Sequence, residues 1–317
     1  MRPIYKIVIG VFLTLPVAAA PATFAYVTNQ GSDNVSVINL DTNEVTGEIK
    51  VGSKPAGVVV SPDGRRVYIS NPESQSVSVI DTHNNEVIEN ISIGDGPLGI
   101  EISPDGKSVY VADWYQHVIS IIDTSTLKLD KTIQVGHSPA GIIADPGGEV
   151  IYVSNRDDNT VMIVDVVTGE IRFTIPVGKA PFGLALSPER NQLFVANVQG
   201  SSVSVVDLKT HKVIKEVKVG LFPYAISYLK QTNRLFVTNQ RDNTVSVIDL
   251  KNYKVIKTID VGDYPEGIDA HPSESYVYVA NWFDGTISAI DTRSLEVSYT
   301  IKAGEGTRAF GRFIISK

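Results

Sequence analysis

Residues 25–41 read AYVTNQGSDNVSVINLD, in which two short runs of alternating apolar residues surround a polar stretch rich in Gly, Ser, Asp and Asn. This pattern predicts a β-hairpin, because alternation gives a strand one apolar face and Gly, Asn and Asp favour turns. The same phrase returns as VYVADWYQHVISIIDT and as VYVANWFDGTISAIDT. The chain is therefore built from repeats, and the residues that change between the copies are the candidates for function.

The repeat has a constant length. An aromatic residue opens the same strand phrase at steps of 42 residues, at Tyr26, Tyr68, Tyr110, Tyr152, Phe194, Phe236 and Tyr278. A period of this length with four short strands per unit indicates propeller blades. We therefore predict an all-β fold, a seven-bladed β-propeller with four antiparallel strands in each 42-residue repeat. A β-solenoid is the alternative, but tight turns such as SPDG at residues 61–64 favour an antiparallel meander.

The two ends of the chain supply parts of one blade. After residue 22 the chain starts with a second-strand phrase, and residues 307–316 (TRAFGRFIIS) read as a first-strand phrase. We predict that this one C-terminal strand joins three N-terminal strands and closes the ring. Residues 23–317 should therefore form a single propeller domain.

The first 22 residues have the pattern of a secretory signal peptide. Arg2 and Lys6 precede an uncharged apolar run over residues 7–20, and small residues follow it. An uncleaved anchor is the alternative, but the run is short for a membrane helix, which needs about 20 residues. We expect a periplasmic or secreted protein with no membrane span after cleavage of residues 1–22.

Composition excludes several kinds of chemistry. The chain has no cysteine, which excludes disulfides and thiolate nucleophiles, and its net charge of -7 makes duplex nucleic acid an unexpected partner. The motifs GxSxG and HExxH are absent. We predict no cofactor and no metal site. His117 and His137, from neighbouring loops of one repeat, are the weak candidates for metal ligands, and we favour their assignment as loop residues.

YVTN at residues 26–29, with SPDG, VSVID and VGxxPxG, resembles the YVTN-family β-propeller repeat proteins over the whole chain after residue 22. The resemblance implies the propeller fold and export. One branch of the family consists of single seven-repeat propellers associated with pyrroloquinoline-quinone (PQQ)-dependent alcohol catabolism in bacteria. Similarity to that branch implies a role accessory to periplasmic quinoprotein alcohol oxidation.

The variable positions gather aromatic residues on one face. In a meander, the loops after the second and the fourth strand of each blade open on the same side of the ring. Both tryptophans occupy one repeat position in these loops. An exposed aromatic cluster is typical of a binding surface, although the same rings could instead pack between blades. The candidates are Trp114, Tyr115, Phe182, Phe222, Tyr224, Tyr264, Trp282 and Phe283.

Two charged residues occupy the position that should lie at the mouth of the central channel. Glu266 and Arg308 occupy this repeat position in two neighbouring blades. The other five blades have an apolar or aromatic residue at the same position. They are expected either to form an ion pair at the seam of the ring or to bind a polar ligand.

The functional hypothesis that follows is an exported, non-enzymatic binding or scaffold propeller, monomeric, with a protein or small-molecule partner on its aromatic loop face. The alternative is a metal-dependent hydrolase or lyase of the lactonase type, with its site at the channel mouth. A cell-surface adhesion module is a weaker hypothesis. A propeller fold alone does not decide between them.

Overall fold

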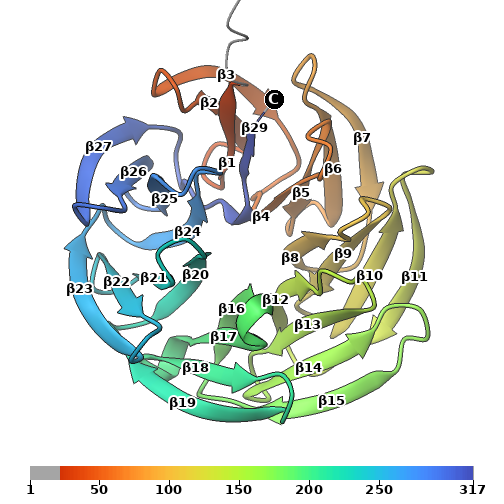
Figure 1. Ribbon diagram of the computed structural model, residues 1–317. Helices are drawn as coiled ribbons and strands as arrows, with labels where there is room; N and C mark the ends of the chain where they lie inside the picture. The colour runs from red at the N-terminus through yellow and green to blue at the C-terminus, as the bar shows by residue number, and fades with distance from the viewer. Residues whose placement is uncertain (1–21, 317) are drawn as a thin grey trace, which may run out of the picture.

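The computed structural model describes residues 22–316, in which 29 strands and two short 3₁₀ helices form blades around a central axis (Figure 1). The predicted signal peptide, residues 1–22, lies almost wholly outside the described residues. The described residues include no α-helix. Neither of their two 3₁₀ helices is long and apolar enough to cross a membrane. The prediction of an all-β propeller with seven blades is confirmed.

Each blade is an antiparallel sheet whose first strand lies near the axis and whose fourth strand lies at the outer edge (Figure 1). Blade 1 combines β29 (Ile314–Ser316), β1 (Thr23–Asn29), β2 (Asn34–Asn39) and β3 (Glu44–Lys50). Blade 2 contains β4 (Gly57–Val60), β5 (Arg66–Asn71), β6 (Ser76–Asp81) and β7 (Glu86–Ser92), and blade 3 contains β8 (Pro97–Ile102), β9 (Ser108–Asp113), β10 (Val118–Asp123) and β11 (Lys128–Gln134).

Blade 4 contains β12 (Pro139–Ala144), β13 (Val150–Asn155), β14 (Thr160–Asp165) and β15 (Ile171–Pro176). Blade 5 contains β16 (Pro181–Ser187), β17 (Gln192–Asn197), β18 (Ser202–Asp207) and β19 (Lys212–Lys218), with the 3₁₀ helices η1 (Pro188–Arg190) and η2 (Val198–Gly200) in its loops. Blade 6 contains β20 (Pro223–Leu229), β21 (Arg234–Asn239), β22 (Thr244–Asp249) and β23 (Lys254–Asp260), and blade 7 contains β24 (Pro265–Ala270), β25 (Tyr276–Asn281), β26 (Thr286–Asp291) and β27 (Glu296–Lys302).

The repeated aromatic residue of the second strand joins neighbouring blades. Tyr68 of blade 2 packs with Val109 and Val111 of blade 3, and Phe236 of blade 6 packs with Val277 of blade 7. All these side chains are buried. A single blade would leave both of its apolar faces exposed, so the core of this molecule forms only when the blades stack.

The innermost strands approach one another closely because a glycine follows the channel-mouth position. A Cβ atom at Gly183 would lie 2.4 Å from the carbonyl oxygen of Tyr224 in the next blade, which is too close for any other residue without a shift of the backbone. The Ser154 hydroxyl similarly donates to the carbonyl of Phe182, 2.7 Å away in the following blade. These contacts fix the spacing of the side chains that reach the channel mouth.

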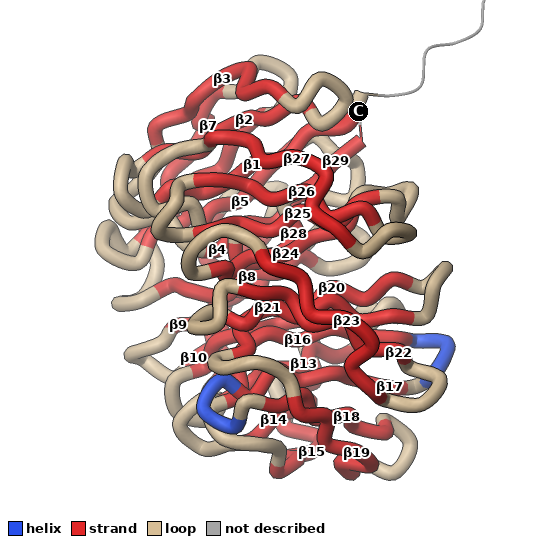
Figure 2. The backbone as a smooth tube through the Cα atoms, turned by 90° about the vertical axis from the view of Figure 1, so that its left-hand side faces the viewer, coloured by secondary structure: helices blue, strands red, loops and turns tan. Residues whose placement is uncertain are grey.

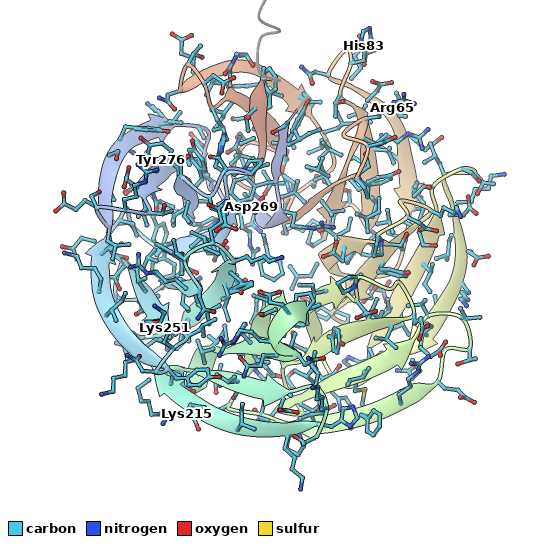
Figure 3. All side chains as sticks on the ribbon, in the orientation of Figure 1. Arg65, His83, Lys215, Lys251, Asp269 and Tyr276 are labelled. Atoms are coloured by element: carbon cyan, nitrogen blue, oxygen red, sulfur yellow. The ribbon has the colours of Figure 1, made fainter. Side chains whose placement is uncertain are left out.

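The C-terminal segment closes the ring, as predicted, but as two short strands rather than one. β28 (Phe310–Arg312) pairs in parallel with β4 of blade 2, and β29 pairs antiparallel with β1 of blade 1. Between them, the backbone N–H groups of Phe313 and Ile314 donate to the Asp269 carboxylate at 2.9 and 3.0 Å. Figure 3 shows Asp269 toward the inner end of blade 7. The segment therefore links blades 7, 1 and 2.

The asparagine that ends the second strand has a structural role in most repeats. In most repeats its side chain bonds hydroxyl groups of the third strand rather than the backbone of its own loop. The Asn239 amide donates to the hydroxyls of Thr244 and Ser246, at 3.0 and 2.9 Å, and the pattern recurs at Asn197 and Asn281. Only the replacement at this position, Asp113, accepts mainly from loop N–H groups.

Candidate functional site

The two kinds of loop predicted to share a face do so, and in six blades a backbone hydrogen bond joins them. The N–H of Trp114 donates to the carbonyl of Gly96, and the N–H of Trp282 donates to that of Tyr264. Figure 2 shows the ring from the side, with loops on both of its faces. The predicted aromatic residues therefore lie on one side, around the mouth of the central channel.

A cavity of about 520 Å³ lies at this mouth, and we call it the mouth cavity. Apolar and aromatic residues of four blades meet there, with polar residues around them. Its lining residues are Gln30, Lys54, Pro72, Glu73, Gln75, Asp95, Gly96, Leu98, Trp114, Tyr115, Phe182, Tyr224 and Arg308.

The aromatic residues of the mouth cavity touch one another. The rings of Phe182 and Tyr224 are 4.2 Å apart between centroids, Phe182 lies 6.3 Å from Trp114, and Phe310 packs beneath both Phe182 and Tyr224. Phe182 and Tyr224 are almost wholly buried, whereas the side chain of Tyr115 is 68% exposed. Phe182 and Tyr224 therefore pack between blades, whereas Tyr115 is exposed at the cavity.

Glu266 and Arg308 form the ion pair that the sequence suggested. Glu266 Oε2 and Arg308 Nε are 2.7 Å apart, and both side chains are buried. Arg308 also donates to the Tyr224 hydroxyl at 2.5 Å, and Gln240 donates to Glu266 at 2.6 Å. Neither Glu266 Oε2 nor Arg308 Nε is aligned for a hydrogen bond, so charge rather than a directed bond joins this pair of atoms.

The pKa values of both residues of this pair are raised, for different reasons. Burial raises the pKa of Glu266 above its usual value, against the opposing effect of Arg308. Burial disfavours the charged guanidinium, but the charges of Glu266 and Tyr224 hold the pKa of Arg308 above its usual range. Arg308 therefore presents a permanently charged hydrogen-bond donor to the mouth cavity.

The other predicted aromatic residues lie outside the mouth cavity. Trp282 and Phe283 line an adjacent hollow of about 420 Å³, which shares Gln30, Lys54 and Glu73 with the mouth cavity. Tyr264 packs on Phe283 with ring centroids 4.6 Å apart. The guanidinium of Arg241 lies over the ring of Phe222, with the guanidinium carbon 3.9 Å from the ring centroid.

His117 and His137 lie together, with ring centroids 4.9 Å apart. His117 Nδ1 accepts the N–H of Ser138 at 3.1 Å, which is the role that Asn243 has toward Tyr264. His137 Nδ1 lies 2.7 Å from the Asp158 carboxylate. The described residues contain no group of three or more His, Cys, Asp or Glu side chains placed to hold a metal ion.

Lys54 is one of several lining residues, Glu73 and Gln75 among them, that the sequence did not single out. It directly precedes the repeat proline, and like Phe222 and Tyr264 at the same repeat position it has a left-handed backbone, with φ near 55°. A residue other than glycine is uncommon in that region. The other blades have a small residue at this position, so the large side chain of Lys54 was a signal of the same kind as the aromatic rings of Phe222 and Tyr264.

Two family models match parts of the chain. The model of the YNCE-like β-propeller matches residues 13–146, and that of the cytochrome D1 heme domain matches residues 192–309. A Mycobacterium tuberculosis protein, the PE-PGRS family protein PE_PGRS18, is 59% identical over 46 residues. That match covers 14% of this chain and 10% of the M. tuberculosis protein.

Solved structures share the fold at low sequence identity. A functionally unknown protein from Desulfotomaculum acetoxidans has a TM-score of 0.79 at 17% identity, over 91% of this chain and 99% of that chain. Kuenenia stuttgartiensis hydrazine synthase has a TM-score of 0.77 at 21% identity, over 90% and 99% of the two chains. The dihydro-heme d1 dehydrogenase NirN in complex with DHE has a TM-score of 0.68 at 19% identity, over 89% of this chain and 64% of that chain.

Proposed function

Because the chain is a seven-bladed propeller of YVTN-type repeats, we propose that it is an exported, non-enzymatic binding protein that holds a small planar molecule in the mouth cavity. The observation that supports this proposal is the lining of that cavity, where Trp114, Tyr115 and Phe182 surround a space of about 520 Å³. Small-molecule sites are commonly concave and largely apolar, with a few polar groups that orient the ligand.

The charges of the lining favour a ligand without a large net charge. Lys54 and Arg308 are balanced by Glu73 and Asp95, and Glu266 neutralises Arg308 from behind. Aromatic rings favour stacking with a flat π-system, and the Arg308 guanidinium favours a hydrogen-bond acceptor. We therefore propose a planar aromatic molecule with carbonyl groups, a class that includes quinones. Such a ligand is compatible with a role accessory to periplasmic quinoprotein alcohol oxidation.

A haem fits the cavity less well, although residues 192–309 match the cytochrome D1 heme domain and include Tyr224 and Arg308. Among the described residues that line the cavity there is no His, Cys or Met, the side chains that most often bind haem iron. We therefore do not propose haem as the ligand of this cavity. The hydrolase alternative has no observation in its favour, because the described residues offer no grouped metal ligands.

Tryptophan fluorescence tests the proposal, since the chain has two tryptophans and only Trp114 lines the mouth cavity. The Trp282→Phe variant leaves Trp114 as the single reporter. We expect PQQ or a naphthoquinone to quench this variant saturably. Isothermal titration calorimetry of the same probes should give the same dissociation constant.

Two exposed aromatic residues provide a matched pair of variants. Tyr115→Ala should weaken probe binding by about tenfold or more, because it removes a stacking wall. Phe283→Ala, which truncates a side chain of similar exposure in the adjacent hollow, should change binding by less than about twofold. Absence of saturable binding by both probes, or equal losses in the two variants, would refute the proposal and favour a protein partner on the loop face.

A further inference from the structure

The outer edge of blades 5 and 6 differs from the rest of the ring in its content of lysine. β19 and β23 both begin with the sequence KVIK. In each strand only the sixth residue is buried, and the isoleucines are well exposed, Ile214 at 49% and Ile256 at 43%. We call these two strands and the turns before them the basic edge. Exposed apolar side chains also occur on the outer strands of other blades, such as Ile88 at 43% and Ile171 at 44%, so the lysines are the feature that distinguishes this edge.

Charge is segregated around the ring. Residues 209–218 and 251–260 contain seven lysines against Glu216 and Asp260. The corresponding residues of blades 1 and 2, 41–50 and 83–92, contain five acidic residues against Lys50. The protein as a whole has a net charge of -7, so the basic edge is a positive region on an acidic molecule.

The lysines of the basic edge are free to meet a partner. Lys218 lies 3.6 Å from Glu216, but in residues 22–316 no ion pair involves Lys212, Lys215, Lys254 or Lys257. Figure 3 labels Lys215 at the outer edge of the ring, on β19, and Lys251 in the turn before β23. Lysines on edge strands also prevent strand-to-strand aggregation, but that task does not require them to be concentrated in two adjacent blades.

The basic edge also suits a flat partner. Blades 5 and 6 are neighbours, and in a seven-bladed ring they are turned by roughly 51°. Four strand spacings place the outer strands about 20 Å from the axis. At that radius the curved surface between β19 and β23 rises only about 2 Å above the straight line that joins the two strands. Both rows of lysine side chains can therefore reach one plane. The strands extend over about 20 Å between the two faces, so the contact has two dimensions.

We propose that the basic edge docks on the surface of a bilayer containing anionic phospholipids. Lysines near such a surface are attracted to it, while their long stems allow neighbouring aliphatic side chains to enter the headgroup region. A protein strand pairing with the outer edge would use one blade and its backbone, and would leave the matching KVIK sequence of the second blade unexplained. This proposal does not depend on the ligand proposed for the mouth cavity, because that cavity is lined by loops around the central channel and not by the outer strands.

Vesicle flotation tests this proposal with the purified protein. We expect binding to vesicles in which one third of the phosphatidylcholine is replaced by phosphatidylglycerol, no binding to phosphatidylcholine alone, and loss of binding at high salt. A variant with four charge reversals should weaken binding by at least about tenfold. Its substitutions are Lys212→Glu, Lys215→Glu, Lys254→Glu and Lys257→Glu.

A control variant makes the same change in net charge elsewhere on the outer strands, with Lys50→Glu, Lys128→Glu, Lys131→Glu and Lys302→Glu. It should keep most of the binding, and an unchanged melting temperature in both variants would exclude unfolding as the cause. Equal losses in the two variants would show that only net charge matters and would overturn the proposal. Binding to soluble polyglutamate without binding to the vesicles would also overturn it, in favour of an acidic protein partner.

Discussion

The buried carboxyl group of Asp269 should make the stability of the closed ring depend on pH. Burial raises the pKa of Asp269 from its ordinary value of 3.8 to about 6, against the opposing effect of the N–H groups of Ile314 and Phe313. In the unfolded chain the group ionises near 3.8, so between these two values folding takes up a proton. Its contribution to stability is therefore fully present below pH 3.8 and is lost as the pH rises through 6.

The magnitude follows from the shift in pKa. A difference of about two units corresponds to about 3 kcal/mol, which is the maximum difference in stability between the acid and neutral limits. Asp269→Asn has an amide oxygen that can accept the same N–H groups and has no charge to bury. Relative to the wild type, the variant should gain stability as the pH rises from 4 to 7.

Urea unfolding of the two proteins from pH 4 to pH 8, followed by tryptophan fluorescence, measures this difference. A difference between the two free energies of unfolding that stays constant with pH would refute the reasoning. Asp291→Asn is a control whose difference from the wild type should stay constant between pH 4 and pH 8. Hydrogen bonds from the Ser294 and Arg293 backbone lower the pKa of Asp291, so its contribution to stability is present above its ordinary pKa and is lost as the pH falls below it.

Two further predictions concern the seam of the ring. Deletion of residues 308–317 removes β28 and β29, and we expect the protein to aggregate; a soluble product with a single cooperative melting transition would contradict this. Glu266→Gln leaves the buried Arg308 charge without its counterion, and we expect a loss of about 3–5 kcal/mol in urea unfolding. A loss below about 1 kcal/mol would show that the pair is not important for stability.

The fold was predictable because each repeat states the same local pattern without insertions. Strand, turn and buried aromatic residue recur at fixed steps. An element whose pattern is ambiguous in one unit can therefore be assigned from the other six. The C-terminal segment has no such support. AFGRFIIS at residues 309–316 alternates like one strand, but Gly311 has φ near 129°, and a Cβ atom there would lie 2.2 Å from the Val58 carbonyl oxygen. The division into β28 and β29 thus depends on contacts with another blade.

The site was predictable only in part. Position in the repeat placed Trp114 and Trp282 on the correct face, but their identical position did not show that they lie in different hollows. That difference arises from neighbours in other blades: Phe182 meets Trp114, whereas Tyr264 meets Trp282. The function of His117 as an acceptor for Ser138 was equally hidden, because this repeat position varies and holds asparagine in only two of the other units, Asn159 and Asn243.

The shared blade also determines when the molecule can be completed. Thr23 pairs with Ser316, and their hydroxyl groups meet across 293 positions of the chain. During synthesis, blades 2 to 7 can form one after another, while β1 keeps an unpaired inner edge until the last strand emerges. Contacts of such long sequence separation form slowly, and an open strand edge is exposed to proteases and chaperones in the meantime. Ring closure therefore waits until residues 310–316 have been synthesised.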